Sequence, residues 1–258
     1  MHVTYRKDYS QSLHRDMEVK VYGHRGKPVV VFPTSDGRFF QYEEFGMLET
    51  LRPFIDRGAI QVWCIDGIDQ ETLTYKGHDI WGAMWRYGQY LHYVAEELIP
   101  FITHHTDTSS EVDGWTGDRH KVLVTGCSLG AFHAANFFFR YPNRADAVIA
   151  LSGVYSTRDF FGEYMPPEVR ENSPLDYLHD HIDEWKWLDY QSSRIVLCCG
   201  QGAWEDQMIR DTVAMRQLLA DRSIPACVDL WGHDVDHDWP WWHKQIVHYL
   251  NQVLEVHW

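Results

Sequence analysis

Long apolar runs are missing from this sequence of 258 residues, and so is a signal peptide. The N-terminus, MHVTYRKDYS, is polar and alternating where a signal peptide needs an apolar stretch. The apolar runs elsewhere are too short to cross a bilayer. The sequence therefore predicts a cytoplasmic protein that does not bind membranes.

Positive charge is also scarce. The chain has 23 basic against 37 acidic residues, a formal net charge of -14, and no stripe rich in Lys or Arg. Such a chain is repelled by the phosphates of nucleic acids and by anionic membranes. Nucleic acid is therefore excluded as a partner and a small molecule is favoured, while the sequence leaves a homo-oligomer open.

Paired cysteines are the third absence. The five cysteines are odd in number and lack the C-x-x-C spacing of zinc sites and redox motifs. They fall on expected core strands, at positions 64, 127, 198, 199 and 227. We expect buried free thiols, no metal site and no cofactor.

What the sequence does contain is a regular alternation of strands and helices. The run PVVVFP at 28–33 is apolar throughout, as expected of a strand covered on both faces. Further strands are expected at 17–23, 60–66, 120–126, 145–153, 193–200 and 226–232, and helices at 41–58, 88–105, 131–141, about 206–221 and from 241. This pattern predicts one α/β domain with a mostly parallel central sheet and helices on both faces.

One segment breaks the alternation. Residues 155–190 separate two strands and contain three prolines, which is too long for an ordinary crossover. Long insertions at the carboxyl ends of parallel strands are often functional. We expect a small cap over the site, with a solvated surface excursion as the alternative.

The sequence GCSLG at 126–130 carries the strongest chemical signal. The expected strand HKVLVTG precedes it and a helix follows, which is the context in which G-x-S-x-G forms a strained turn that exposes a nucleophilic serine. Ser128 is the predicted nucleophile. The alternative is a glycine-lined packing turn.

A nucleophilic serine needs a base and an acid, which follow it in the order acid, then histidine, in this kind of fold. His237 lies on a loop after the last strand and is preferred over His233, which directly follows that strand. Glu205 follows the preceding strand and a glycine-rich bend, and is preferred over its neighbour Asp206.

An oxyanion hole needs two backbone N–H groups. One is expected from Leu129, the residue after the nucleophile. The other is expected from Thr34 or Ser35, in the loop PTSDGRF after the early apolar strand. The alternative is that these loop residues are only turn formers.

The stretches VTGCSLGAFHAANFFFRYP, GQGAWED and HDWPWW together resemble the putative esterase family of α/β-hydrolases, a group that includes esterase D, feruloyl esterases and the mycolyltransferases. The resemblance implies an α/β-hydrolase fold and a triad at Ser128, Glu205 and His237. One departure is clear: many members have His-Gly after the early strand, where this chain has Pro33-Thr34.

These signals predict a serine carboxylesterase that cleaves a small ester through an acyl-enzyme. Three alternatives stay open. They are acyl transfer to another alcohol, a binding module that has lost catalysis, and a metal-dependent hydrolase built on HDVDHD at 233–238. Short loop spacing disfavours the metal site.

The sequence is rich in aromatics, with 12 Trp among its 258 residues. Several lie within a few residues of the predicted site, including Trp204 and Trp239, or in the expected cap, including Trp185 and Trp187. We expect these rings either to line an apolar substrate pocket or to pack helices onto the sheet.

Overall fold

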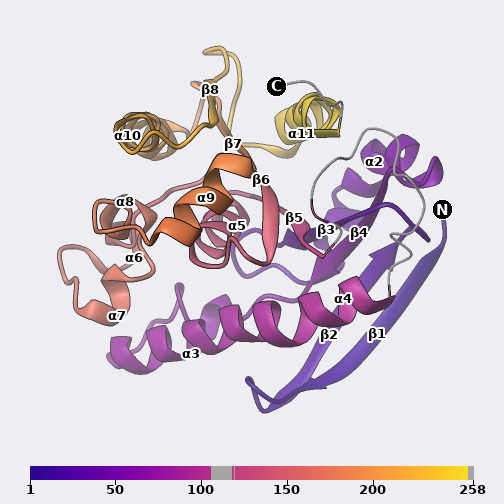
Figure 1. Cartoon of the computed structure of the whole chain (residues 1–258), viewed down its shortest axis with the longest axis horizontal. Coiled ribbons are helices and arrows are strands. Elements are labelled where there is room, and N and C mark those ends of the chain that lie inside the picture. Colours follow the sequence, from indigo (N-terminus) through magenta and orange to yellow (C-terminus); the bar gives the residue numbers. More distant parts are fainter. Residues whose placement is uncertain (106–117, 119, 255–258) are drawn as a thin grey trace.

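The computed structural model describes residues 1–105, 118 and 120–254. Its centre is an eight-stranded sheet in the order β1-β2-β4-β3-β5-β6-β7-β8 (Figure 1). β1 pairs with β2, and β2 with β4, in the antiparallel direction, whereas every pair from β4 to β8 is parallel. The predicted α/β class and mostly parallel sheet are confirmed.

All seven predicted strands are present. They are β2 (Arg15–Tyr22), β3 (Lys27–Phe32), β4 (Ile60–Ile65), β5 (Val122–Cys127), β6 (Ala145–Leu151), β7 (Arg194–Cys199) and β8 (Cys227–Leu230). The prediction missed an eighth, β1 (Val3–Ser10), at the edge of the sheet. Most of its side chains are exposed on both faces, so its sequence has no apolar face that would indicate burial against a core.

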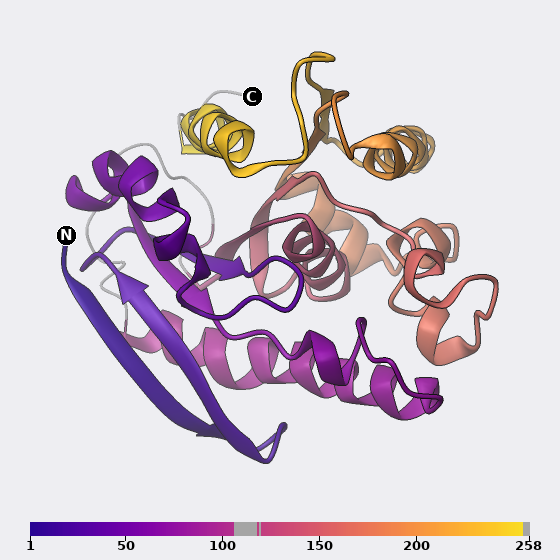
Figure 2. The same ribbon diagram turned by 180° about the vertical axis from the view of Figure 1, so that it is seen from behind.

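Helices cover both faces of the sheet, as Figure 1 and, from behind, Figure 2 show. One core packs under α3 (Ile80–His92), α4 (Ile99–His105), α5 (Leu129–Arg140) and α10 (Asp206–Asp221). The other lies between the sheet and α2 (Met47–Asp56) and α11 (Trp239–Leu254). The strands of the central sheet are therefore buried on both sides, which explains their continuous apolar runs.

Two predicted helices differ from the observed ones. The single helix expected at 41–58 is divided into α1 (Gln41–Glu44) and α2, because Gly46 between them takes a left-handed φ of 75°. The helix expected at 88–105 begins earlier, at Ile80, where the Asp79 side chain accepts the Gly82 N–H. A π-helical stretch, Tyr93–Leu98, joins α3 to α4 just ahead of Pro100, which has no N–H to donate.

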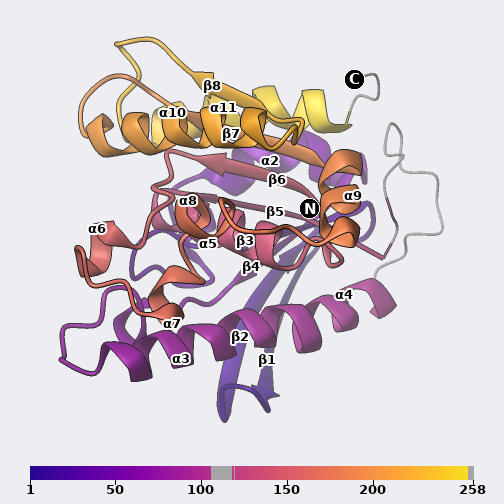
Figure 3. The same cartoon turned by 60° about the vertical axis from the view of Figure 1, so that its left-hand side comes forward.

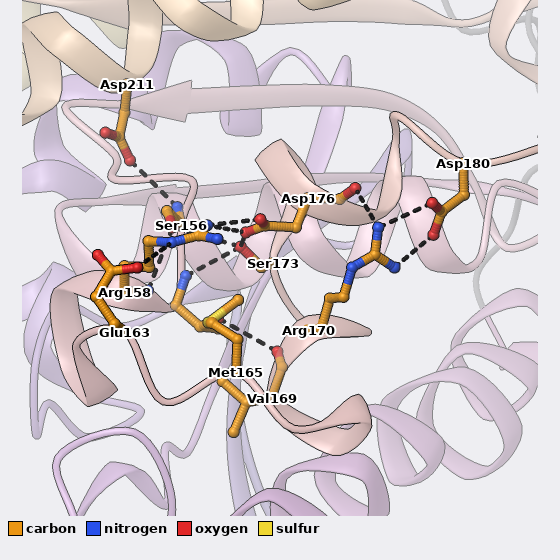
Figure 4. A network of polar contacts seen from close by, with 11 residues as sticks. Ser156, Arg158, Glu163, Met165, Val169, Arg170, Ser173, Asp176, Asp180 and Asp211 are labelled. Atoms are coloured by element: carbon orange, nitrogen blue, oxygen red, sulfur yellow. Dashed lines mark hydrogen bonds and ion pairs between the residues drawn. The ribbon is translucent and has the colours of Figure 1, made fainter.

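The segment 155–190 folds into four short helices: α6 (Arg158–Phe161), α7 (Pro167–Arg170), α8 (Pro174–Tyr177) and α9 (Glu184–Ser192). Figure 3 shows α6, α7 and α8 beside α5 and α3. Ion pairs hold the segment together, including Arg158 with Asp176 and Arg170 with Asp180 (Figure 4). Its ring contacts with α5 include Phe160 against Phe132, with centroids 5.4 Å apart, and Tyr190 against Phe139, at 5.6 Å. A cap function for this segment stays a prediction.

The five cysteines are free thiols, and all but the partly exposed Cys227 are buried. None of the helices in the described ranges combines the length and hydrophobicity needed to cross a membrane.

Candidate active site

Ser128 lies in a sharp turn between β5 and α5, with φ 57° and ψ -125°. Its N–H donates to the carbonyl of Leu151 on β6, at 2.9 Å. The flanking glycines are required by close packing: a Cβ on Gly126 would lie 2.3 Å from the Gly130 carbonyl, and one on Gly130 would lie 2.4 Å from the Phe32 carbonyl. The turn is therefore strained and tightly packed, and its serine is partly exposed.

His237 comes from the loop after β8 and faces this serine. Its Nε2 lies 2.9 Å from the Ser128 Oγ. The backbone N–H of His237 donates to the Ala203 carbonyl, so the loop after β8 is joined to the loop after β7. The Trp242 ring stands nearly perpendicular to the imidazole, at 5.0 Å between centroids. These contacts hold the position and the orientation of the imidazole ring beside Ser128.

Glu205 is fully buried beside the other imidazole nitrogen. Its Oε2 lies 3.5 Å from the His237 Nδ1, and within the described part of the chain neither atom has a hydrogen-bond partner. The other carboxylate oxygen, Oε1, accepts the Ser152 hydroxyl at 2.5 Å and the Gly200 N–H at 3.3 Å. The carboxylate is thus held from behind and presents one free oxygen to the histidine.

The alternatives to these two residues point elsewhere. His233 and Asp206 are both exposed, and Asp206 is the first residue of α10. The structure therefore brings Ser128, His237 and Glu205 together and leaves His233 and Asp206 outside the cluster.

Sequence reasoning missed Ser152, and it considered Trp242 only as one of the rings that could line a pocket. The Ser152 hydroxyl donates to Glu205 and accepts the indole N–H of Trp242 at 3.0 Å. Ser152 directly follows β6 with a left-handed φ of 55°. The only signal available was its place at the end of an apolar strand, next to the expected site.

The loop after β3 passes close to the strained turn at 126–130, which we call the elbow, because the carbonyls of Phe32 and Pro33 lie against Gly130. The Thr34 N–H donates to the Gln41 side chain at 2.8 Å and is therefore occupied. Over the described ranges, no hydrogen bond is made by the N–H of Ser35 or of Leu129. Of the two loop residues considered, Ser35 has the available donor.

The aromatic residues named in the sequence analysis differ in exposure and in contacts. Trp204, next to Glu205, has a left-handed φ of 67° and is 85% exposed. Trp239 stacks on Phe45 at 4.5 Å between centroids. Trp187 donates its indole N–H to the carbonyl of Arg222, the residue that ends α10 ahead of β8, so it lies toward the amino ends of the strands. The hypothesis that Trp187 lines the site is therefore wrong.

The acidic and histidine residues at 233–238 do not converge. Asp236 accepts the Ala203 N–H at 2.7 Å, Asp238 accepts the Trp239 N–H at 2.7 Å, and His237 faces Ser128. Across residues 1–105, 118 and 120–254, no group of three or more His, Cys, Asp or Glu side chains is placed to share a metal ion.

Several solved structures of esterases and serine hydrolases have a fold similar to that of this chain. It is similar to a ferulic acid esterase at 19% identity, with a TM-score of 0.74 and 98% of each chain covered. An S-formylglutathione hydrolase from Staphylococcus aureus gives 14% identity and a TM-score of 0.69, with 98% of this chain and 97% of that chain covered. A fluorophosphonate-binding serine hydrolase from the same organism gives 12% and 0.66, with 99% of each covered.

Because these identities are low, the similarity to solved structures establishes the fold and nothing about activity. A search of curated proteins found no match. A family model described as Putative esterase, however, matches residues 10–253, nearly the whole chain. The protein belongs to the putative esterase family, and its fold is that of an α/β-hydrolase.

Proposed function

We propose that the protein is a serine hydrolase that cleaves a small carboxylic ester through an acyl-enzyme, with Ser128, His237 and Glu205 as its triad. The observation that carries the proposal is the 2.9 Å contact between the His237 Nε2 and the Ser128 Oγ, with a buried carboxylate behind the other imidazole nitrogen. A base within hydrogen-bond reach of the nucleophile, itself oriented by a third group, is the geometry that acyl transfer requires.

In the first half of the reaction, His237 takes the Ser128 proton while the Oγ attacks the ester carbonyl carbon. The carbonyl π electrons move onto oxygen and form an oxyanion. When the tetrahedral intermediate collapses, the bond to the alcohol oxygen breaks, and the imidazolium gives its proton to the departing alcohol. In the second half, His237 deprotonates a water that attacks the acyl carbon, and the carboxylic acid and Ser128 are released.

The remaining groups support these steps. Glu205 stabilises the imidazolium, and its own position is supported by Ser152 and, through that hydroxyl, by Trp242. The Leu129 and Ser35 amides form the oxyanion hole. This assignment is supported by the occupied Thr34 amide and by the close approach of the loop after β3 to the elbow.

The substrate class follows from charge and exposure. A chain with a net charge of -14 favours a neutral ester over an anionic one. The exposed Trp204 beside the triad provides an apolar surface for part of the substrate. Free cysteines accord with a location in the cytoplasm.

The test combines a fluorophosphonate probe with a panel of p-nitrophenyl and aromatic esters. We expect the wild type to be labelled at Ser128, as located by peptide mass spectrometry, and to hydrolyse esters. Ser128→Ala should lose labelling and at least about 10³-fold of kcat/KM while remaining folded. Ser192→Ala, which changes an exposed serine on α9, is the matched control and should behave as wild type.

Each competing function predicts a different result. A binding module would show neither labelling nor turnover in the wild type. A metal-dependent hydrolase would keep its activity in Ser128→Ala and lose it to a chelator. An acyltransferase would form an ester product in preference to the acid when a second alcohol is supplied, and that outcome would replace water as the acceptor in the proposal.

A further inference from the structure

A chain of buried polar side chains lies behind the site and is used by none of the steps above. Asp69 lies in the short helix Asp69–Glu71 and is hydrogen-bonded to His133 of α5. Its Oδ1 lies 2.9 Å from the His133 Nε2. The other imidazole nitrogen, Nδ1, lies 3.0 Å from the Tyr87 hydroxyl on α3. All three side chains are almost completely buried.

The second oxygen of Asp69 reaches the loop that carries the proposed oxyanion donor. Its Oδ2 accepts the backbone N–H of Asp36 at 2.8 Å. Asp36 follows Ser35 directly and has a left-handed φ of 55°, a conformation that a non-glycine residue holds only when its surroundings impose it. The buried carboxylate therefore helps to fix the peptide between Ser35 and Asp36, together with the turn bond from the Gly37 N–H to the Thr34 carbonyl.

The other end of this row of polar side chains lies on α5, the helix that begins directly after Ser128. His133 lies five residues after Ser128 on α5, whose first residue, Leu129, is the other proposed oxyanion donor. Asn136 of the same helix donates to the Tyr87 hydroxyl at 3.4 Å, which secures the helix to α3 a second time. One network thus connects the loop after β3 to the helix that begins at the elbow.

We propose that Asp69 and His133 are positioning residues that set the distance between the two halves of the oxyanion hole, the Ser35 amide and the Leu129 amide. The inference rests on the proposed function. Oxyanion donors accelerate a reaction only when they are already aimed at the developing charge, and the loss of one such donor costs about 10²- to 10³-fold in kcat. A loop displaced by loss of the Asp69 carboxylate would forfeit part of that factor.

This role differs from a purely structural one in the kinetic parameter it affects. An oxyanion donor acts on the transition state more than on the bound ester, so mispositioning should lower kcat and leave KM nearly unchanged. It should also weaken a boronic acid inhibitor, whose tetrahedral serine adduct places an oxygen in the hole. A loss of stability alone would change neither quantity in the folded fraction.

The experiment compares Asp69→Ala and Asp69→Asn with wild type in steady-state ester hydrolysis and in boronic acid inhibition. For Asp69→Ala we expect kcat to fall about 10- to 100-fold, KM to change less than about threefold, and the boronic acid Ki to rise in parallel with the loss of kcat. Asp69→Asn should recover most of kcat, because its side-chain oxygen can still accept the Asp36 N–H. Asp146→Ala, which removes a buried carboxylate at the opposite edge of the sheet, is the control and should keep kcat.

If Asp69→Ala does not fold, the double variant Asp69→Leu, His133→Phe replaces both buried partners with apolar groups, which avoids leaving either of them unpaired. It should fold and still lose kcat, because the Asp36 N–H has lost its acceptor. A kcat within threefold of wild type in the folded Ala or double variant would overturn the inference. So would an Asn variant as impaired as Ala.

The same assay separates this inference from the proposed function. A wild type without labelling or turnover, or an active Ser128→Ala, overturns both. A wild type that hydrolyses esters through Ser128, with Asp69 variants that keep wild-type kcat and Ki, overturns only the positioning role.

Discussion

The carboxyl ends of the strands, which form the carboxyl edge of the central sheet, differ in structure from the amino ends, which form its amino edge. At the carboxyl edge, Asp36, Ser128, Ser152 and Trp204 follow β3, β5, β6 and β7 with φ between 55° and 67°. They are four of the six non-glycine residues with positive φ in the described part of the chain. Backbone strain is therefore concentrated where the predicted site lies, as expected when the fold holds reactive side chains in fixed, unfavourable conformations.

The amino edge contains a buried ion pair, and Ser223 is the non-glycine residue with positive φ that lies toward it. Lys27 begins β3 and is buried, with its Nζ 2.8 Å from the Asp146 Oδ1 and 2.6 Å from the Lys121 carbonyl. Burial lowers the pKa of Lys27 to about 8, an effect that Asp146 opposes, and burial also raises the pKa of Asp146. This edge acts on stability, and the carboxyl edge on chemistry. Variants at the two edges should therefore separate the two properties.

The largest effect is expected from His237. His237→Ala should lower kcat/KM by at least about 10³-fold, because base and nucleophile act as a unit, with little change in melting temperature. His233→Ala, a histidine four residues away on the same loop, should stay within a few fold of wild type. Steady-state kinetics on one p-nitrophenyl ester measures both, and reversed ranks would move the base to His233.

Glu205 should come next. Glu205→Gln should lower kcat by about 10²- to 10³-fold, because an amide cannot stabilise the imidazolium as a carboxylate does. Asp206→Asn, at an exposed helix start, should have little effect. The pair is compared by kcat at saturating ester, and a larger loss in Asp206→Asn would make Asp206 the orienting acid.

At the opposite edge, Asp146→Ala should lower the free energy of unfolding by about 3 kcal/mol, because it leaves the Lys27 ammonium buried without its carboxylate. Asp189→Ala removes the partner of Lys121, in an ion pair that is more exposed than that of Lys27 and Asp146. It should lower the free energy of unfolding by less than about 1 kcal/mol. Urea unfolding gives both values. A large fall in kcat of folded Asp146→Ala would contradict the division of roles between the edges.

The smallest effect concerns pH. Burial, with a contribution from Asp211, raises the pKa of Asp159 on α6 from 3.8 to about 6. The folded state therefore binds more protons than the unfolded state between these values, and stability falls as pH rises through that window. Asp159→Asn removes this penalty and should raise the free energy of unfolding at pH 7 by less than about 1 kcal/mol after solvent screening, with no gain at pH 4. The gain is measured as a higher melting temperature at pH 7.

Asp180→Asn is the control of opposite sign. Arg170 lowers the pKa of Asp180, so its carboxylate stabilises the fold at pH 7 and its loss should lower the melting temperature there. If both variants shift the melting temperature in the same direction at pH 7, local charge is not the cause.

The parts of the molecule that the sequence predicts are those with a local cause. The apolar runs of the central strands and the GCSLG turn depend on neighbouring residues, and both were found where predicted. The edge strand β1 was missed because most side chains on both its faces are exposed to solvent. The break at Gly46 was missed because a glycine within a helical pattern does not by itself indicate a helix end.

Contacts between distant segments could not be predicted. The Ser152 hydroxyl meets Glu205 and Trp242 only because β6, β7 and α11 converge at one edge of the sheet. The pairing of Asp69 with His133, 64 residues apart, likewise depends on how α5 packs. No regular spacing in one sequence predicts such contacts. They orient the side chains of the site, whereas the residue types of the site could be predicted.

The residue before the elbow serine has a chemical consequence of its own. Cys127 is completely buried, its Sγ lies 3.7 Å from the Tyr42 hydroxyl, and burial raises its pKa to about 12. A thiol reacts with alkylating agents only as a thiolate, so this sulfur should be inert near neutral pH although it adjoins the partly exposed serine. Electrophiles that enter the site therefore meet oxygen and not sulfur, and reagents such as iodoacetamide should reach Cys127 only when the fold opens.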